Sequence, residues 1–155
     1  MELWDRFYNA PGFMTYSRTY SLSATFPARL AELRRLGGFI EDYCADHGIG
    51  REHRLRLNLV LEELFVNTIR HGHRGDCDAP VWVTVAAEPS AVHVTYEDSA
   101  PPFNPYAHLP VKTPDNTLEM RKVGGLGVLL TRGLAASRDY AYLFGRNRIR
   151  LALNR

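Results

Sequence analysis

The sequence predicts an α/β fold in two layers, with a mixed, mostly antiparallel sheet covered on one face by helices. Two pairs of alternating segments are each separated by turn residues, which is typical of antiparallel hairpins. Two earlier segments repeat apolar residues at helical spacing, which is typical of helices that pack one face on a sheet. The hairpin segments are 81–85 with 92–97 and 140–144 with 148–153, and the helical segments are 27–44 and 51–72.

Composition predicts a single soluble domain over residues 1–155. The hydrophobic share is 45% and the charged share 23%, which is ordinary for globular proteins. A net charge of +2 and a pI of 8.6 are too mild to indicate direct nucleic-acid binding. Cys44 and Cys77 have neither disulfide nor metal spacing, and there is no signal peptide, so we expect a reduced, cytoplasmic compartment. No apolar run approaches membrane-spanning length, so no membrane partner is expected.

The chain begins with an aromatic extension over residues 1–15. This segment is too apolar for a free tail, so we expect it to dock on the body or on a second copy of the chain, in a homodimer. Residues 16–26 alternate as a strand, and Pro27 suits the first turn of the helix that follows. The Gly37-Gly38 pair in that helix predicts close packing or a kink.

The second helix carries the stretch around which the site is predicted. Its core stripe repeats at helical spacing and consists of Leu57, Leu61, Leu64, Phe65 and Thr68. Glu63 and Asn67 share a different face, with Arg70 beside them, and apolar residues flank this face. Such a face is expected if the helix also forms the wall of a pocket. The alternative is a solvated glutamate on an ordinary amphipathic helix.

Asp98 ends the strand of the first hairpin. Val92, Val94, Tyr96 and Asp98 point to one face by the period of two, and the first three are core-like. Asp98 is therefore expected to face the helices, where a carboxylate needs hydrogen-bond partners or a ligand. The alternative is an aspartate that caps the following loop.

The stretch after Asp98 predicts a binding loop and a second site element. Three prolines exclude regular structure over 99–105, and residues 106–123 continue as a long irregular segment, which is typical of a lid. Gly124, Gly125 and Gly127 then precede a helix predicted over 126–136. Exposed N–H groups at a helix start suit phosphate, although a plain helix-start turn has the same pattern.

These motifs together resemble the GHKL ATPase superfamily, and within it the bacterial anti-sigma-factor serine kinases. The resemblance covers roughly Tyr16 to Asn154. It rests on Glu63-x-x-x-Asn67, on Asp98-x-Ala100-x-Pro102-Phe103-x-Pro105, and on Gly124-Gly125-Leu126-Gly127 in that order. It implies the two-layer sandwich of the GHKL (Bergerat) type. It also implies an anti-sigma factor that uses ATP and Mg²⁺ to phosphorylate a serine or threonine on a small antagonist protein.

The resemblance also implies a role for each site residue. Glu63 would be the general base, Asn67 would bind Mg²⁺ through its carbonyl oxygen, and Asp98 would accept a hydrogen bond from the adenine amino group. Residues 106–123 would be the ATP lid, with Lys112, Arg121 or Lys122 facing phosphate. The other nucleotide-binding positions implied are Arg70, Ala100, Pro102, Phe103, Gly124, Gly125, Leu126, Gly127 and Val128.

Two positions depart from the family pattern. Ala100 stands where the family has glycine, and its methyl group weakens nucleotide binding if the position needs a positive φ or a close approach of adenine. Asn104 replaces an aspartate. The rival interpretation is therefore a nucleotide-binding or protein-binding regulatory module of the same fold without kinase activity. A third is an ATPase domain without a sigma-factor partner.

Overall fold

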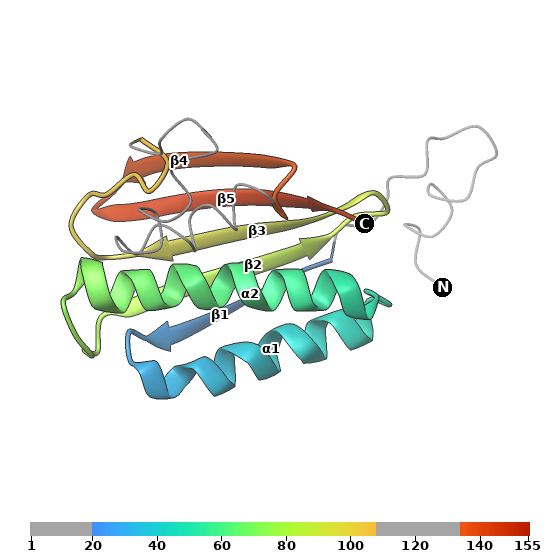
Figure 1. The fold of residues 1–155 in the computed structure, drawn as a ribbon, viewed down its shortest axis with the longest axis horizontal. Helices are drawn as coiled ribbons and strands as arrows, with labels where there is room; N and C mark the ends of the chain where they lie inside the picture. Colours follow the sequence, from blue (N-terminus) through green and yellow to red (C-terminus); the bar gives the residue numbers. More distant parts are fainter. Residues whose placement is uncertain (1–19, 108–133) are drawn as a thin grey trace, which may run out of the picture.

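The computed structural model describes residues 20–107 and 134–155, which form one antiparallel sheet with two helices on one face (Figure 1). The strand order is β1-β2-β3-β5-β4, and every neighbouring pair is antiparallel. The predicted α/β fold class is thus confirmed. The strands are β1 (Tyr20–Pro27), β2 (Pro80–Ala87), β3 (Ala91–Asp98), β4 (Ser137–Leu143) and β5 (Arg146–Asn154). The helices are the short 3₁₀ turn η2 (Leu30–Glu32), α1 (Leu33–Asp46), α2 (Arg51–Asn67) and the π-helical turn η3 (Thr68–Gly72).

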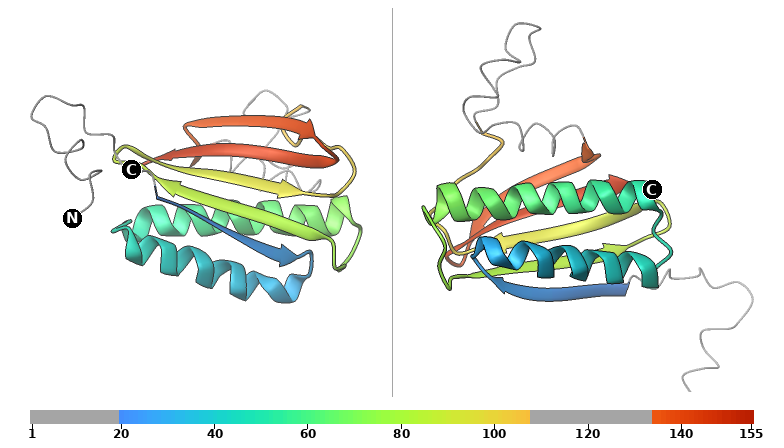
Figure 2. Two further views of the ribbon diagram at one scale, coloured as in Figure 1. Left: turned by 180° about the vertical axis from the view of Figure 1, so that it is seen from behind. Right: turned by 60° about the horizontal axis from the view of Figure 1, so that its bottom comes forward.

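The core lies between the helices and the face of the sheet that they cover (Figure 2). Inward positions of the central strands alternate with outward ones, as the period of two requires. Buried aliphatic side chains supply the inward positions, including Val81, Val83 and Val85 on β2 and Ile149, Leu151 and Leu153 on β5. The predicted inward register of Val92, Val94, Tyr96 and Asp98 on β3 is confirmed, since all four are buried.

Pro27 is placed differently from the prediction. It ends β1 opposite Pro80, and helical structure begins only at Leu30. A proline pair suits the end of a ladder, because neither residue has an N–H to donate there. Beyond it Ala28 donates its N–H to the carbonyl oxygen of Ala79 at 2.9 Å, and the chain bends there, with the N–H of Arg29 bonded to the carbonyl oxygen of Pro27 at 2.7 Å.

The glycine pair in α1 does not mark a close contact. Outside its own helix backbone, a Cβ atom added at Gly37 or Gly38 would meet no heavy atom of the described residues within 4 Å. Of the two predicted alternatives, close packing is therefore wrong among the described residues, and a kink stays a prediction. The helix packs instead through Leu36, Ile40 and Tyr43, all of them buried.

Several predicted elements lie outside the described residues. They are the aromatic extension 1–15, the part of the lid beyond residue 107, and the phosphate motif with Gly124, Gly125, Leu126, Gly127 and Val128. Of the helix predicted over 126–136, the described part begins at Leu134, and β4 already begins at Ser137. Among the described residues, no helix is long and apolar enough to cross a membrane.

Candidate functional site

The last turn of α2 and the end of β3 lie at the same end of the molecule, at the left of Figure 1. The predicted core stripe of α2 is confirmed, since Leu57, Leu61, Leu64, Phe65 and Thr68 are all buried. Thr68 ends this stripe with a hydroxyl group that faces the sheet. Its hydroxyl group thus lies next to Asp98, the last residue of β3.

Three buried side chains form a hydrogen-bonded chain between the helix and the sheet. Thr68 is 6% exposed and donates its Oγ1 hydrogen to Oδ2 of Asp98 at 2.9 Å. The hydroxyl oxygens of Thr68 and Tyr96 lie 2.8 Å apart, and the Tyr96 hydroxyl is also 3.3 Å from the carbonyl oxygen of Leu64. Since the Thr68 hydrogen goes to Asp98, the single Tyr96 hydrogen is shared between Oγ1 of Thr68 and the carbonyl oxygen of Leu64. The Thr68 hydroxyl thus links Tyr96 to the carboxylate of Asp98.

Tyr96 is held in its neutral form. Burial raises the pKa of Tyr96 well above the ordinary tyrosine value, the hydrogen bond to Thr68 opposes this shift, and the nearby charge of Asp98 adds to it. The phenol therefore keeps its proton throughout the physiological range and remains a donor.

Asn147, the first inward residue of β5, completes the network. It is 4% exposed and lies opposite Asp98 in the ladder between β3 and β5. Its Nδ2 donates to Oδ1 of Asp98 at 2.8 Å and also approaches the carbonyl oxygens of Ala100 at 3.0 Å and Pro101 at 3.2 Å. Its Oδ1 accepts from the Phe103 N–H at 3.0 Å and from the Tyr140 hydroxyl at 2.8 Å.

The carboxylate of Asp98 retains one acceptor position. Its Oδ1 accepts two hydrogen bonds, from Asn147 and from the Ala100 N–H at 2.9 Å, whereas its Oδ2 accepts one from Thr68. A carboxylate offers about four acceptor positions. One position on Oδ2 therefore remains for a donor from outside the described residues. The alternative, that Asp98 caps its own loop, accounts for only one of the three bonds.

Ala100 packs against the end of the helix. It is 3% exposed, and a Cβ atom added at Gly72 in η3 would lie 2.7 Å from its own Cβ. Among the described residues, the non-glycine residues with positive φ are Arg74 and Phe144, so Ala100 has an ordinary backbone conformation. The position does not need the conformational freedom of glycine, and Gly72 provides the room for the extra methyl group.

The π-helical turn sets this contact. The N–H of His73 bonds to the carbonyl oxygen of Thr68 at 2.8 Å, five residues back. Such turns insert one residue into a helix and are frequent at functional sites. The helical periodicity of the sequence did not indicate this π-helical turn. A glycine at position 72 is the local signal that the chain passes close to another backbone there.

Glu63 and Asn67 lie at the edge of the buried stripe, and both are partly exposed. Each immediately precedes a residue that bonds to β3, since Leu64 binds Tyr96 and Thr68 binds Asp98. Within the part of the chain that the structure describes, neither side chain has a hydrogen-bond or ion-pair partner. Their polar groups therefore remain available to a ligand. Glu62, in contrast, is exposed on another face of the helix.

The remaining predicted residues divide into two groups. Phe103 and Pro102 follow Asp98 on the exposed loop, where Phe103 is 64% exposed and is anchored through its backbone N–H. Arg70 is exposed in η3. The structure thus brings Asp98, Ala100 and the 101–103 loop together with Thr68 and Asn147, which the sequence argument did not select. Asn147 could have been found from its period-two register with Ile149, Leu151 and Leu153.

Comparison with known proteins decides the family. The model of the histidine kinase-like ATPase domain family matches residues 26–153. The chain belongs to this family. It is a GHKL-type ATPase domain, and it contains the helix, the carboxylate-bearing strand and the hairpin described above within the matched range.

One similar solved structure and one negative result complete the comparison. The Acinetobacter baumannii histidine kinase AdeS is 14% identical, with a TM-score of 0.43, and the match covers 86% of this chain and 67% of that one. No curated protein matches the sequence.

The described residues fit the groups that a histidine kinase-like ATPase domain binds, which are ATP and usually Mg²⁺. The free acceptor position on Asp98 suits an amino group of a base, and the uncommitted amide oxygen of Asn67 suits Mg²⁺, which prefers hard oxygen ligands. No group of three acidic, histidine or cysteine residues that could hold a metal occurs among the described residues. Such a set is not required, because Mg²⁺ in nucleotide sites is bound largely by phosphates and water.

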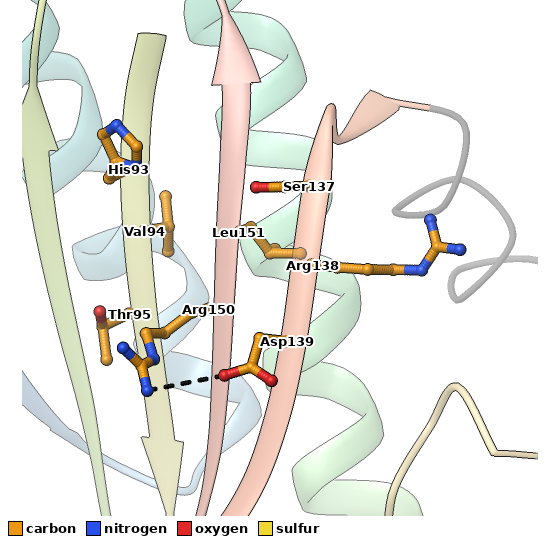
Figure 3. Close-up of a pocket in the computed structure, with 8 residues that line it drawn as sticks. All are labelled: His93, Val94, Thr95, Ser137, Arg138, Asp139, Arg150 and Leu151. Carbon is orange, nitrogen blue, oxygen red and sulfur yellow. Dashed lines mark ion pairs between the residues drawn. The ribbon is translucent and has the colours of Figure 1, made fainter.

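A separate hollow on the opposite face of the sheet is not this site. It has a volume of about 260 Å³ and lies over β3, β5 and β4 (Figure 3). An ion pair of 3.5 Å between Arg150 and Asp139 spans it. None of the predicted site residues lines it, and Asp98 faces the helices instead.

Proposed function

We propose that this protein is an anti-sigma factor that binds ATP and Mg²⁺ and phosphorylates a serine or threonine on a small antagonist protein. Its class, a nucleotide-binding regulatory module or kinase of the GHKL type, follows from the family. The finer assignment is supported by the joint order of the three motifs and by the residues that gather around Asp98.

The observation that carries the nucleotide proposal is the single free acceptor position on a buried carboxylate. Three donors fix the carboxylate of Asp98 from three segments, namely η3, β5 and its own loop. One amino hydrogen of adenine would complete its hydrogen bonding. The base of GTP presents a carbonyl oxygen at the equivalent position, and two acceptors facing each other would be unfavourable.

For catalysis, Glu63 and Asn67 would take separate roles. The serine hydroxyl oxygen would bond to the γ-phosphorus of ATP while Glu63 accepts the hydroxyl proton, and ADP would leave. Asn67 would bind Mg²⁺, which neutralises charge on the phosphates. Arg70, Ala100, Pro102 and Phe103 would line the nucleotide. Gly124, Gly125, Leu126, Gly127 and Val128 would bind the phosphates through their backbone, with 106–123 as the lid.

The proposed partners are a sigma factor and its antagonist protein, in the cytoplasm, without direct contact to nucleic acid or membrane. A homodimer would be compatible with this role. The test is transfer of labelled phosphate from ATP to purified candidate antagonists with Mg²⁺ present. Incorporation that requires Glu63 supports the kinase assignment. ATP binding without transfer to any antagonist that the protein binds would instead support a regulatory module.

A further inference from the structure

Asn147 joins three parts of the candidate site through one buried side chain. Its amide contacts the carboxylate of Asp98, the backbone of the loop from Ala100 to Phe103, and the hydroxyl of Tyr140 on β4. We propose that Asn147 is a positioning residue, which orients the carboxylate of Asp98 and holds the following loop in the shape that accepts the nucleotide base. This inference rests on the proposed nucleotide binding.

The chemistry of the contacts explains why an amide is needed. The nitrogen end of the side chain faces only acceptors, which are a carboxylate oxygen and two carbonyl oxygens. The oxygen end faces only donors, which are an N–H and a hydroxyl. The orientation of the amide is therefore fixed, because a flip would place donor against donor and acceptor against acceptor.

The position of Asn147 in the ladder makes this arrangement rigid. Asn147 is the Cα partner of both Asp98 on β3 and Tyr142 on β4, so paired strands hold its backbone on both sides. Its amide thereby ties the 101–103 loop to the rigid sheet. The position of Asp98 Oδ2, where the free acceptor lies, depends on how the amide holds Oδ1.

This geometry predicts an unusual behaviour for Asn147→Asp. The new carboxylate has nearly the same shape but lies against Asp98, so two negative charges would share the site. The two carboxylates would then share a proton, with one pKa of the pair raised. When that proton is bound, the substituted side chain again donates to Asp98 Oδ1, and its other oxygen still accepts from Phe103 and Tyr140. The affinity of the variant for ATP should thus recover as the pH falls.

Other ionisable groups near this network must be separated from the effect. They are Tyr96 on β3, Tyr140 on β4, His71 and His73 on either side of Gly72, and Glu97 with Arg148 on the outer face of the sheet. Burial raises the pKa of Tyr140, so both tyrosines remain neutral below pH 8. The histidines are present in both proteins, as are the phosphates of ATP. The informative quantity is therefore the ratio of variant to wild-type affinity at each pH.

The experiment measures ATP affinity by calorimetry with Mg²⁺, and the melting temperature without ligand, from pH 5.5 to 8 for wild type and three variants. Asn147→Asp is the test, Asn147→Leu removes the polar groups, and Asn154→Asp makes the same change at an exposed end of β5. We expect Asn147→Asp to bind about 5- to 150-fold more weakly than wild type at pH 8, and the ratio to recover severalfold at pH 5.5. Asn147→Leu should bind weakly at every pH, and Asn154→Asp should match wild type.

The ligand-free measurement separates the two levels of the proposal. When folding raises a pKa of the carboxylate pair, the shared proton stabilises the folded variant at pH values below that pKa. This stabilisation is lost as the pH rises through it. The melting temperature of Asn147→Asp should therefore fall relative to wild type between pH 5.5 and 8. A deficit in ATP affinity with no dependence on pH, in a folded variant, would overturn the positioning role alone. Failure of the wild type to bind ATP at any pH would overturn the proposed function, and the positioning role with it.

Discussion

Gly72 and Ala100 contact each other so closely that only one of them can carry a Cβ atom: a Cβ added at Gly72 would lie 2.7 Å from that of Ala100. The helix end and the loop after Asp98 therefore meet at a single methyl group. The substitution of alanine for the glycine of related motifs is accommodated within the fold, on the side facing η3.

This contact predicts a compensating pair of substitutions. Gly72→Ala should destabilise the protein by about 1–3 kcal/mol, because the two methyl groups overlap and the loop must move. It should also weaken ATP binding, since the same loop supplies an N–H to Asp98. Thermal unfolding and calorimetry measure both effects.

The double variant Gly72→Ala with Ala100→Gly is the control for this pair. It moves the methyl group from one side of the contact to the other and should recover most of the lost stability, as expected for residues in direct contact. If the stability change of the double variant equals the sum of the two single changes, the two positions do not share this space.

Thr68 and Tyr96 form a second pair with unequal predicted effects. Thr68→Val keeps the shape but leaves Oδ2 of Asp98 without its donor, so we expect a loss of about 1–3 kcal/mol and weaker ATP binding. Tyr96→Phe leaves the bond from Thr68 to Asp98 intact. We therefore expect the free energy of unfolding to fall by about 0.5–1.5 kcal/mol, with little change in ATP affinity. Urea unfolding and calorimetry on both variants check this order. A stronger effect of Tyr96→Phe on ATP affinity would contradict the direction of the hydrogen-bonded chain.

Glu63 and Glu62 test the catalytic assignment. Glu63→Gln should leave ATP affinity nearly unchanged and lower phosphoryl transfer by about 10²–10⁴-fold, because a general base contacts the nucleophile and not the purine. Glu62 lies about 100° around the helix and is exposed, so Glu62→Gln should have a far milder effect. Transfer of labelled phosphate to an antagonist protein is the measurement. Loss of transfer in Glu62→Gln alone would show that the assigned helix face is wrong.

Asn67→Ala should affect binding and transfer together. If Asn67 holds Mg²⁺, its loss should weaken ATP binding only when Mg²⁺ is present, because the metal would neutralise charge on the phosphates. Calorimetry with Mg²⁺ and with a chelator provides the comparison. Equal loss of affinity under both conditions would assign Asn67 a role without metal.

Much of the fold followed from local periodicity, because that signal is carried by neighbouring residues. The alternation of Val92, Val94 and Tyr96 was enough to place Asp98 facing the helices. The spacing of the α2 stripe likewise placed Thr68 toward the sheet. Pro27 was misplaced because the same residue suits the first turn of a helix and the end of an edge strand.

The network around Asp98 was less predictable because its members are far apart in sequence. Asn147 is 49 residues from Asp98 and Thr68 is 30 residues away. The sequence argument counted Thr68 as part of the core stripe and left Asn147 between the hairpin segments 140–144 and 148–153. Both conclusions treated each residue within its own segment, whereas the chemistry of a buried carboxylate depends on which segments meet there.

The most direct test of the central claim is the affinity of the wild type and of Asp98→Asn for ATP and GTP in the presence of Mg²⁺, measured by calorimetry. If the free acceptor on Asp98 reads the amino group of adenine, the wild type binds ATP more tightly than GTP. Asp98→Asn would then bind ATP about 5- to 150-fold more weakly, because an unmet buried hydrogen bond costs about 1–3 kcal/mol. Equal affinity of the wild type for the two nucleotides, or no binding of either, would contradict the account.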